Sequence, residues 1–277
     1  MTAHIRKSIL IVSLLLILAS ACGGGENLSI SGKPGNGTLT IFAAASLTEA
    51  MSEIGKEFES AYPGIEVAIN FAGSQQLAQQ LSQGASADIY ASADKQQMEN
   101  VIQSGRVTSD SARAFIHNRL AVVLPGSNPG NIQDIKDLAK PGLQLLLADE
   151  AVPVGRYSQE MLDRASEQSG YGIEFKEGVL GNVVSYEENV RPVLTKIILG
   201  EADAGIVYVS DVIGSREADI YLIEIPEQFN VTASYYIAPI SDSSNLNRGK
   251  DFIHLLLSPK GQEILERYGF SRVGQYG

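Results

Sequence analysis

Four positions in the sequence lie where a helix is expected to begin directly after a strand or a turn. Ser46 and Ser74 each follow an apolar strand, Val154 follows Pro153, and Val190 opens a fourth helix. The first N–H groups of a helix have no partner within the helix and carry about half a positive charge, so they bind anions without a charged side chain. A serine at a helix start is more often only a cap, and the pattern alone leaves both interpretations open.

Other catalytic or metal-binding patterns are missing from the sequence. None of His4, His117 and His254 is spaced with another histidine or a carboxylate as a metal site requires, and each is expected to be a surface or structural residue. The single cysteine, Cys22, permits neither a disulfide nor a thiolate metal site within one chain. A Ser–His–Asp hydrolase on an α/β scaffold stays open as an alternative. We expect no enzyme, no cofactor and no direct metal ligation.

The net charge of −11 argues against nucleic acid as a partner, because phosphate binding needs clustered lysine and arginine. It also seems to argue against an anionic ligand. That objection is weak, because net charge is screened beyond about 8–10 Å in salt while N–H dipoles act at contact distance.

The N-terminus has the order of a bacterial lipoprotein signal. Basic residues precede an apolar run from Ile9 to Leu18, which is too short to span a membrane, and small residues lead to Cys22. We predict a signal at residues 1–21, lipidation of Cys22 and a flexible Gly-rich tether at 22–37. The protein is therefore expected outside the cytoplasm, in the periplasm or on the outer face of the cytoplasmic membrane, held by its lipid anchor alone.

The elements that would position the four helix starts alternate between strand and helix. Strands are expected at 39–45, 65–71, 89–91, 120–124, 143–148, 204–209, 220–225 and 233–240. Helices with a 3.6-residue apolar period are expected between them, and Ser46 with Glu49 has the spacing of a capping box. This alternation predicts an α/β fold with a mainly parallel sheet, whose strand ends gather the helix starts at one edge.

Seven segments resemble the molybdate-binding proteins of ABC importers, in order and at matching spacing from about Leu39 to Phe270. They are FAAASLTEAM (42–51), FAGSQQLAQQL (71–81), ADIYASAD (87–94), VPVGRYSQEML (152–162), ENVRPVL (188–194), GIVYVSD (205–211) and ERYGF (266–270). The resemblance implies a two-lobed periplasmic-binding-protein type 2 fold with the ligand in the cleft between lobes. It places residues 38–121 and 235–277 in the first lobe and residues 122–234 in the second.

The resemblance also implies how the ligand is held. Ser46 and Ser74 would donate from the first lobe, and the backbone N–H groups of Val154 and Val190 from the second, together with the phenol of Tyr208. The implied ligand is molybdate, with tungstate close in size, carried to an ABC permease by a monomer.

Related receptors of a second branch are expected to add two carboxylates to the metal. Here the corresponding positions are Val152 and Val207, so a tetrahedral oxyanion is predicted. Glu187 and Glu188 lie nearby in sequence and are expected only to charge the start of the following helix. A receptor for another oxyanion, such as sulfate or phosphate, is the alternative.

Overall fold

The computed structural model describes residues 37–215 and 218–274, which belong to one compact unit. The predicted signal, Cys22 and the tether up to residue 36 lie outside the described residues. Gly37, assigned from the sequence to the end of the tether, is the first residue of the first strand and donates its N–H to the Gly64 carbonyl.

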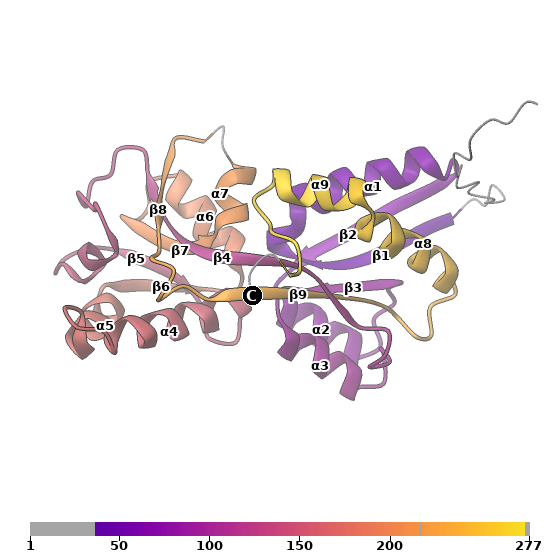
Figure 1. Cartoon of the computed structure of the whole chain (residues 1–277), viewed down its shortest axis with the longest axis horizontal. Coiled ribbons are helices and arrows are strands. Elements are labelled where there is room, and N and C mark those ends of the chain that lie inside the picture. Colours follow the sequence, from indigo (N-terminus) through magenta and orange to yellow (C-terminus); the bar gives the residue numbers. More distant parts are fainter. Residues whose placement is uncertain (1–36, 216–217, 275–277) are drawn as a thin grey trace, which may run out of the picture. The chain divides into compact units, whose positions relative to one another are not determined.

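The first lobe is a sheet between two layers of helices (Figure 1). In the figure, α1, α8 and α9 lie above its strands, and α2 and α3 lie below. The bounds are β1 (Gly37–Ala44), α1 (Thr48–Ala61), β2 (Ile65–Ala72), α2 (Ser74–Ser82), β3 (Ile89–Ser92), α3 (Lys95–Gln103), β9 (Thr232–Pro239), α8 (Leu246–Leu257) and α9 (Pro259–Arg267).

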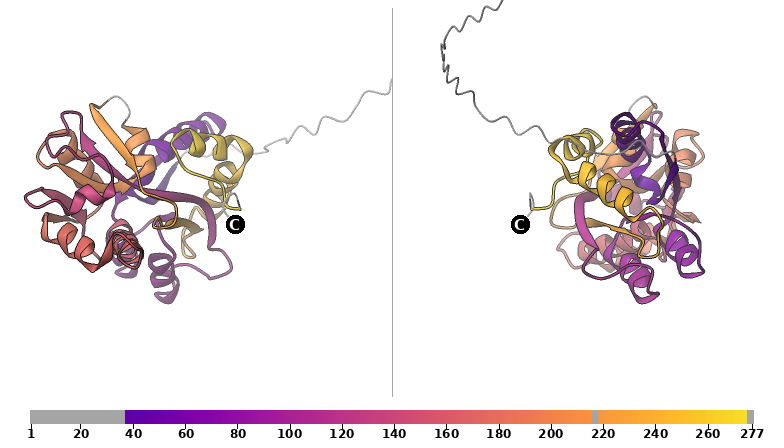
Figure 2. Two further views of the ribbon diagram at one scale, coloured as in Figure 1. Left: turned by 60° about the vertical axis from the view of Figure 1, so that its left-hand side comes forward. Right: turned by 90° about the vertical axis from the view of Figure 1, so that its right-hand side faces the viewer.

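The second lobe repeats this layering with helices α6 and α7 on one side and α4 and α5 on the other (Figure 1). The bounds are β5 (Leu145–Ala148), α4 (Pro153–Ser166), α5 (Gly172–Gly181), β6 (Val183–Glu187), α6 (Val190–Ile198), β7 (Ala204–Tyr208), α7 (Val209–Gly214) and β8 (Ile220–Glu224). Figure 2 shows the helices on both faces of the strands from two other directions.

One long strand, β4 (Arg113–Pro125), is hydrogen-bonded in both lobes. Its first half pairs with β9, and residues from Leu120 onward pair with β7 and β8. The strand order is β2-β1-β3-β9-β4-β7-β5-β6, with β8 on β4. The prediction of a strand at 120–124 therefore found only the fully apolar half of β4. The division at residues 121/122 and 234/235 stays a prediction.

The expected mainly parallel sheet is only partly observed. Strands β2, β1 and β3 are parallel, as are β6, β5 and β7, but β4 and β9 pair antiparallel with all their neighbours. Helix crossovers produce the parallel pairs. The two long strands return the chain between lobes without such a crossover, so they run antiparallel.

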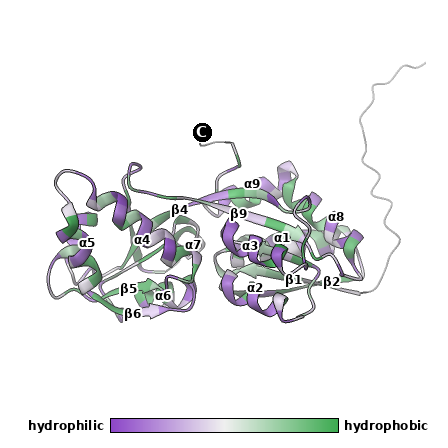
Figure 3. Ribbon diagram, turned by 90° about the horizontal axis from the view of Figure 1, so that it is seen from below, coloured by the Kyte–Doolittle hydropathy of each residue, from purple (hydrophilic) through white to green (hydrophobic). Residues whose placement is uncertain are grey.

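Hydrophobic periodicity explains why α1 packs where it does. Met51, Ile54 and Phe58 are fully buried, at the 3- and 4-residue spacing of one helix face. The helix ends before Pro63 and Gly64, and Gly64 has the positive φ of 93° that favours glycine. Figure 3 shows hydrophobic strands enclosed by helices that carry both hydrophobic and hydrophilic faces.

The sequence did not predict α5, β6 or the short helix α7. In β6, exposed and half-buried residues alternate along an edge strand, so its apolar signal is weak. Helix α7 has only six residues, too few for a clear period. Within the described residues, no helix has the length and apolar content needed to cross a membrane.

Candidate functional site

All five residues predicted to donate to a ligand line one cavity between the lobes. The cavity has a volume of about 20 Å³. First-lobe residues and second-lobe residues both contribute to its wall. The lining residues are Ala44, Ala45, Ser46, Ala72, Gly73, Ser74, Ala93, Val152, Pro153, Val154, Asn189, Val190 and Tyr208. The structure therefore brings the five together, and their role in binding stays a proposal.

Ser46 is oriented by a chain of hydrogen bonds that the sequence did not predict. Its buried Oγ lies 2.8 Å from the Oη of Tyr235 on β9. Asn118 Nδ2, which can only donate, lies 3.4 Å from the same Oη. Tyr235 thus accepts from Asn118, and its own proton is available to Ser46 Oγ. The Ser46 hydroxyl proton is then left to donate into the cavity.

The capping box predicted from Ser46 and Glu49 is wrong. Ser46 lies in a 3-10 turn, Ala45–Leu47, and Leu47 rather than Ser46 is the N-cap of α1. No side-chain cap forms at either position. Ser46 bonds to Tyr235 instead, and Glu49 forms an ion pair with Arg191 of the second lobe. Tertiary partners have replaced the local ones.

Ser74 is the first residue of α2, as predicted, so its N–H is one of those left unpaired by the helix. Its Oγ accepts a 3.0 Å hydrogen bond from the N–H of Ala93, and its carbonyl accepts one of 2.9 Å from the Tyr90 hydroxyl. Because Oγ already accepts from a backbone N–H, its own proton can point to a ligand. Tyr90 and Ala93 therefore fix both ends of this donor.

The second lobe presents two helix starts. Helix α4 begins at Pro153, so Val154 is its second residue, and Pro153 suits the first position because it needs no N–H partner. Helix α6 begins at Val190, after Asn189, whose side chain accepts from the Arg191 N–H at 2.9 Å. The Val154 and Val190 N–H groups are among those that a helix cannot pair internally.

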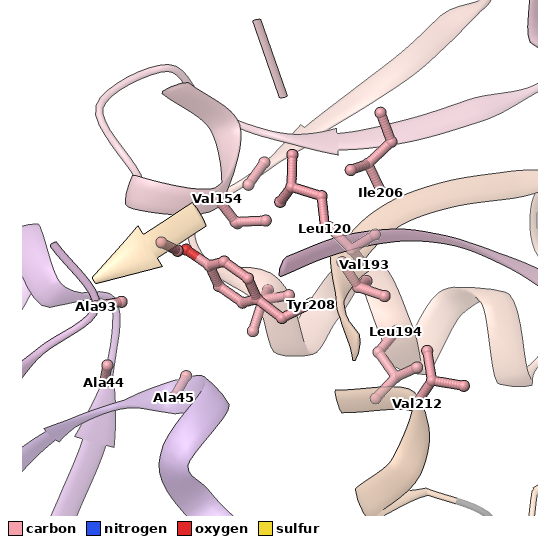
Figure 4. Close-up of a cluster of buried hydrophobic side chains, with 14 of the residues drawn as sticks. Ala44, Ala45, Ala93, Leu120, Val154, Val193, Leu194, Ile206, Tyr208 and Val212 are labelled. Atoms are coloured by element: carbon pink, nitrogen blue, oxygen red, sulfur yellow. The ribbon is translucent and has the colours of Figure 1, made fainter. Parts of the chain in front are cut away.

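The hydroxyl of Tyr208 is buried and has no hydrogen-bond partner among the described residues. The side chain is only 1% exposed and ends at the cavity. In Figure 4 its oxygen points to the side where Val154 of the second lobe approaches Ala93 of the first. Burial raises the pKa of this phenol well above its usual 10, so it acts as a neutral donor. A buried donor without a partner costs about 1–3 kcal/mol, which a ligand would recover.

Two arginines come from the ligand-site motifs, yet neither lines the cavity. Arg156 in α4 pairs with Asp94 of the first lobe at 2.6 Å. Arg191 in α6 pairs with Glu49 and donates through Nε to the Ala45 carbonyl at 3.1 Å. Both positive charges are therefore matched by carboxylates across the cleft. The cavity wall consists only of neutral groups.

Asp211 is a second buried carboxyl group beneath the site. Its Oδ2 accepts a 3.0 Å hydrogen bond from the Tyr208 N–H, and its Oδ1 has no partner among the described residues. Burial raises its pKa to about 7, against the opposing pull of Arg191. Near neutral pH this group is therefore partly protonated, which limits the negative charge close to the cavity.

The two glutamates before α6 differ in their contacts. Glu187 pairs with Lys196 of the same lobe, and the burial of its carboxyl is outweighed by Lys196 and Ser185, which lower its pKa. Glu188 reaches the first lobe, where its carboxylate accepts from Gln76 at 3.0 Å and its carbonyl from Gln75 at 2.9 Å. The prediction that both only charge the helix start missed this contact.

Among the residues that the structure describes, the histidines and the two valines considered in the sequence analysis form no catalytic or metal-binding group. His117 on β4 has its Nδ1 3.0 Å from Oγ of Ser234 on the neighbouring strand β9, and His254 is exposed on α8. Val152 lines the cavity, while Val207 is fully buried behind it. Residues 37–215 and 218–274 contain no group of three or more His, Cys, Asp or Glu side chains suited to a metal ion. That no side chain binds a metal directly stays a prediction.

A family model described as a bacterial extracellular solute-binding protein matches residues 39–271. The chain belongs to this family. The molybdate-binding protein ModA of Mycobacterium tuberculosis is 35% identical over 265 residues, which cover 95% of this chain and 96% of the relative. ModA of Escherichia coli is 31% identical over 241 residues, covering 85% of this chain and 89% of the relative. The predicted resemblance to molybdate-binding proteins is confirmed.

A solved structure supports the same assignment. The substrate-binding domain of a putative molybdenum ABC transporter from Clostridium difficile is 29% identical and covers 85% of this chain and 99% of its own, with a TM-score of 0.63. The two-lobed α/β solute-binding fold predicted from the motifs is therefore confirmed.

Sequence reasoning missed the residues that support the donors in this family member. Tyr235, Asn118 and Asp94 act through contacts that are distant in sequence. Asp211 contacts the N–H of Tyr208, three residues before it. The arginines of VPVGRY and ENVRPVL were a signal that could have been used. An arginine next to a neutral ligand-binding residue is expected to pair with a carboxylate. The buried carboxylates of the first lobe were therefore the candidates to consider.

Proposed function

We propose that this protein is an extracytoplasmic receptor of an ABC importer that captures molybdate, and tungstate, as a tetrahedral oxyanion. The observation that carries the proposal is the hydroxyl of Tyr208, which is buried at the cavity and has no hydrogen-bond partner in the part of the chain that the structure describes. Helix-start amides and serine hydroxyls line the same cavity. The relatives named ModA bind molybdate, and their similarity extends over nearly the whole chain.

Neutral donors are sufficient for tight binding. Five hydrogen bonds to a dianion, at about 1.5–3 kcal/mol each, give roughly 10 kcal/mol before the costs of lobe closure and immobilisation. A remainder of about 8 kcal/mol corresponds to a Kd of about 1 μM. Release needs no ion pair with the ligand to be broken, which suits a protein that must deliver its cargo to a permease.

Donors held at helix starts favour the larger oxyanions. The oxygens of molybdate and tungstate lie farther from the central atom than those of sulfate or phosphate. Donors fixed on helix ends cannot follow a smaller ion inward, so some hydrogen bonds to sulfate would lengthen and weaken.

The binding of phosphate is also disfavoured by its protonation. Near neutral pH it keeps at least one proton, which needs an acceptor when buried. No carboxylate is among the described residues that line the cavity. The lining therefore offers hydrogen-bond donors to a fully ionised anion and no carboxylate to accept the proton of phosphate.

Calorimetric titration of the mature protein with molybdate, tungstate, sulfate and phosphate tests the proposal. We expect molybdate and tungstate to bind at least about 100-fold more tightly than the other two, equivalent to about 2.7 kcal/mol. Sulfate binding as tight as molybdate binding would assign the protein to the alternative oxyanion receptors. Elemental analysis for molybdenum, tungsten and sulfur after dialysis gives an independent check.

The remaining parts of the proposal follow from the same role. The receptor acts as a monomer, without turnover, cofactor or nucleic-acid partner, and is held to the membrane by lipidated Cys22. Metabolic labelling with a fatty acid analogue, compared between the native chain and Cys22→Ala, tests the anchor. A label retained in the variant would exclude Cys22 as its attachment site.

A further inference from the structure

We propose that Arg156 and Arg191 are positioning residues that latch the two lobes together around the oxyanion, through Asp94 and Glu49. This inference rests on the proposed function and deepens it. Neither arginine lines the cavity, so neither is placed to contact the ligand. Each links a ligand donor of one lobe to a ligand donor of the other.

The first link joins the Val154 and Ser74 donors. Arg156 lies two residues after Val154 and pairs at 2.6 Å with Asp94, whose side chain is 1% exposed. Asp94 is adjacent to Ala93, and the Ala93 N–H donates to Ser74 Oγ. The Asp94 carboxylate also caps α3 by accepting from the Gln97 N–H at 2.8 Å. Asp94 is therefore held in place within the first lobe. Arg156 belongs to the second lobe and would reach Asp94 when the lobes close.

The second link joins the Val190 and Ser46 donors. Arg191 directly follows Val190, pairs with Glu49 on α1 and donates to the Ala45 carbonyl. Ala45 directly precedes Ser46 in the same 3-10 turn. The second link resembles the first. In both, an arginine near the start of a second-lobe helix contacts a group close to a first-lobe serine. Gln75 and Gln76, next to Ser74, add two neutral contacts to Glu188.

Each of these contacts joins residues of different lobes. We therefore expect opening of the cleft to separate them, so that they stabilise the closed state alone. A contact made only when the lobes are closed raises the closed fraction and lowers the apparent Kd by the same factor. It slows dissociation more than it changes association, since the lobes must open before the ligand leaves. The arrangement also keeps both arginine charges neutralised outside the cavity, so that size rather than charge selects the ion.

A double-mutant cycle on the first pair tests the latch. Asp94→Asn removes the charge and keeps a side chain that can still cap α3. Arg156→Gln removes the cation. We expect each single variant to weaken molybdate binding about tenfold, almost wholly through faster dissociation in stopped-flow measurements. The double variant should be little worse than either single variant, because the pair is lost only once.

Glu99→Gln is the matched control. Glu99 lies on α3, five residues after Asp94, and forms an exposed pair with Lys95, with side chains 48% and 68% exposed. The substitution changes the same net charge on the same helix, and we expect binding within about twofold of the native value. Ligand-free thermal unfolding of every variant establishes that it is folded. If a first-pair variant does not fold, Glu49→Gln, Arg191→Gln and their double variant supply the same cycle.

The outcomes separate the latch from the receptor proposal. Failure of the native protein to bind molybdate overturns both. Tight binding by the native protein, with dissociation unchanged in the folded variants or with fully additive losses in the double variant, overturns the latch alone. Faster dissociation with coupled losses, and no change in Glu99→Gln, supports it.

Discussion

The phenol oxygen of Tyr235 lies 2.8 Å from the hydroxyl oxygen of Ser46, although 189 positions separate the two residues. Tyr235 is fully buried on β9, between Asn118 and Ser46. The burial of this phenol raises its pKa well above 10, so it remains a neutral donor at every physiological pH. The pair sets the direction in which the Ser46 proton points.

Tyr235→Phe is therefore expected to weaken molybdate binding by about 1 kcal/mol, or roughly fivefold, because Ser46 loses the partner that orients it. Calorimetry measures the change. Tyr236→Phe, the adjacent residue on the other face of the same strand, should leave affinity unchanged. Equal effects of the two substitutions would mean that β9 packing, rather than the Ser46 contact, is responsible.

Tyr208→Phe separates ligand binding from folding. The substitution removes one donor to the anion and should weaken binding by about 1–3 kcal/mol. Because the hydroxyl has no hydrogen-bond partner within residues 37–215 and 218–274, the ligand-free Tm should stay constant or rise. Thermal unfolding with and without molybdate reports both quantities. A fall in the ligand-free Tm with unchanged affinity would give Tyr208 a structural role instead.

Val190→Pro tests a backbone donor directly. Proline fits the first position of a helix, and Asn189 already has the extended backbone that a following proline requires, with φ −164° and ψ −179°. The substitution deletes the N–H and should weaken molybdate binding about tenfold or more. Val190→Ala keeps the N–H and is the control for lost packing. Similar affinities in the two variants would remove this amide from the site.

Asp211 predicts a dependence of stability on pH. Its pKa in the folded protein is raised to about 7, so between about pH 4 and pH 7 the folded state holds a proton that the unfolded state has released. Stability from this group is greatest at the acidic end and falls as pH rises through that window. Asp211→Asn should flatten this slope and stabilise the protein by about 2–4 kcal/mol at pH 8.

Urea unfolding across the pH range measures the Asp211 effect. Glu224→Gln, which alters an exposed carboxylate on β8, should reproduce the native slope. Glu49 and Arg191 are the charged groups that also act on Asp211, so the latch variants at those positions should shift the same window. A native slope preserved in Asp211→Asn would assign the titration to another group.

The sequence by itself determined the family, the alternation of strand and helix, and five of the residues that line the cavity. Ser74, Val154 and Val190 could be placed because a helix start is a local property, set by the residues beside it. The apolar period of α1 likewise needed nothing beyond its own segment. The motifs around these positions supplied Tyr208 and the order of the lobes.

Only the tertiary structure decided which partners these residues take. Ser46 and Glu49 have the spacing of a local cap, yet Tyr235 and Arg191 bind them instead. The length and antiparallel direction of β4 and β9 also depend on pairing between distant segments. Hydrogen bonds and ion pairs between distant segments are chosen by which groups become buried together, and that is settled only when both lobes have folded.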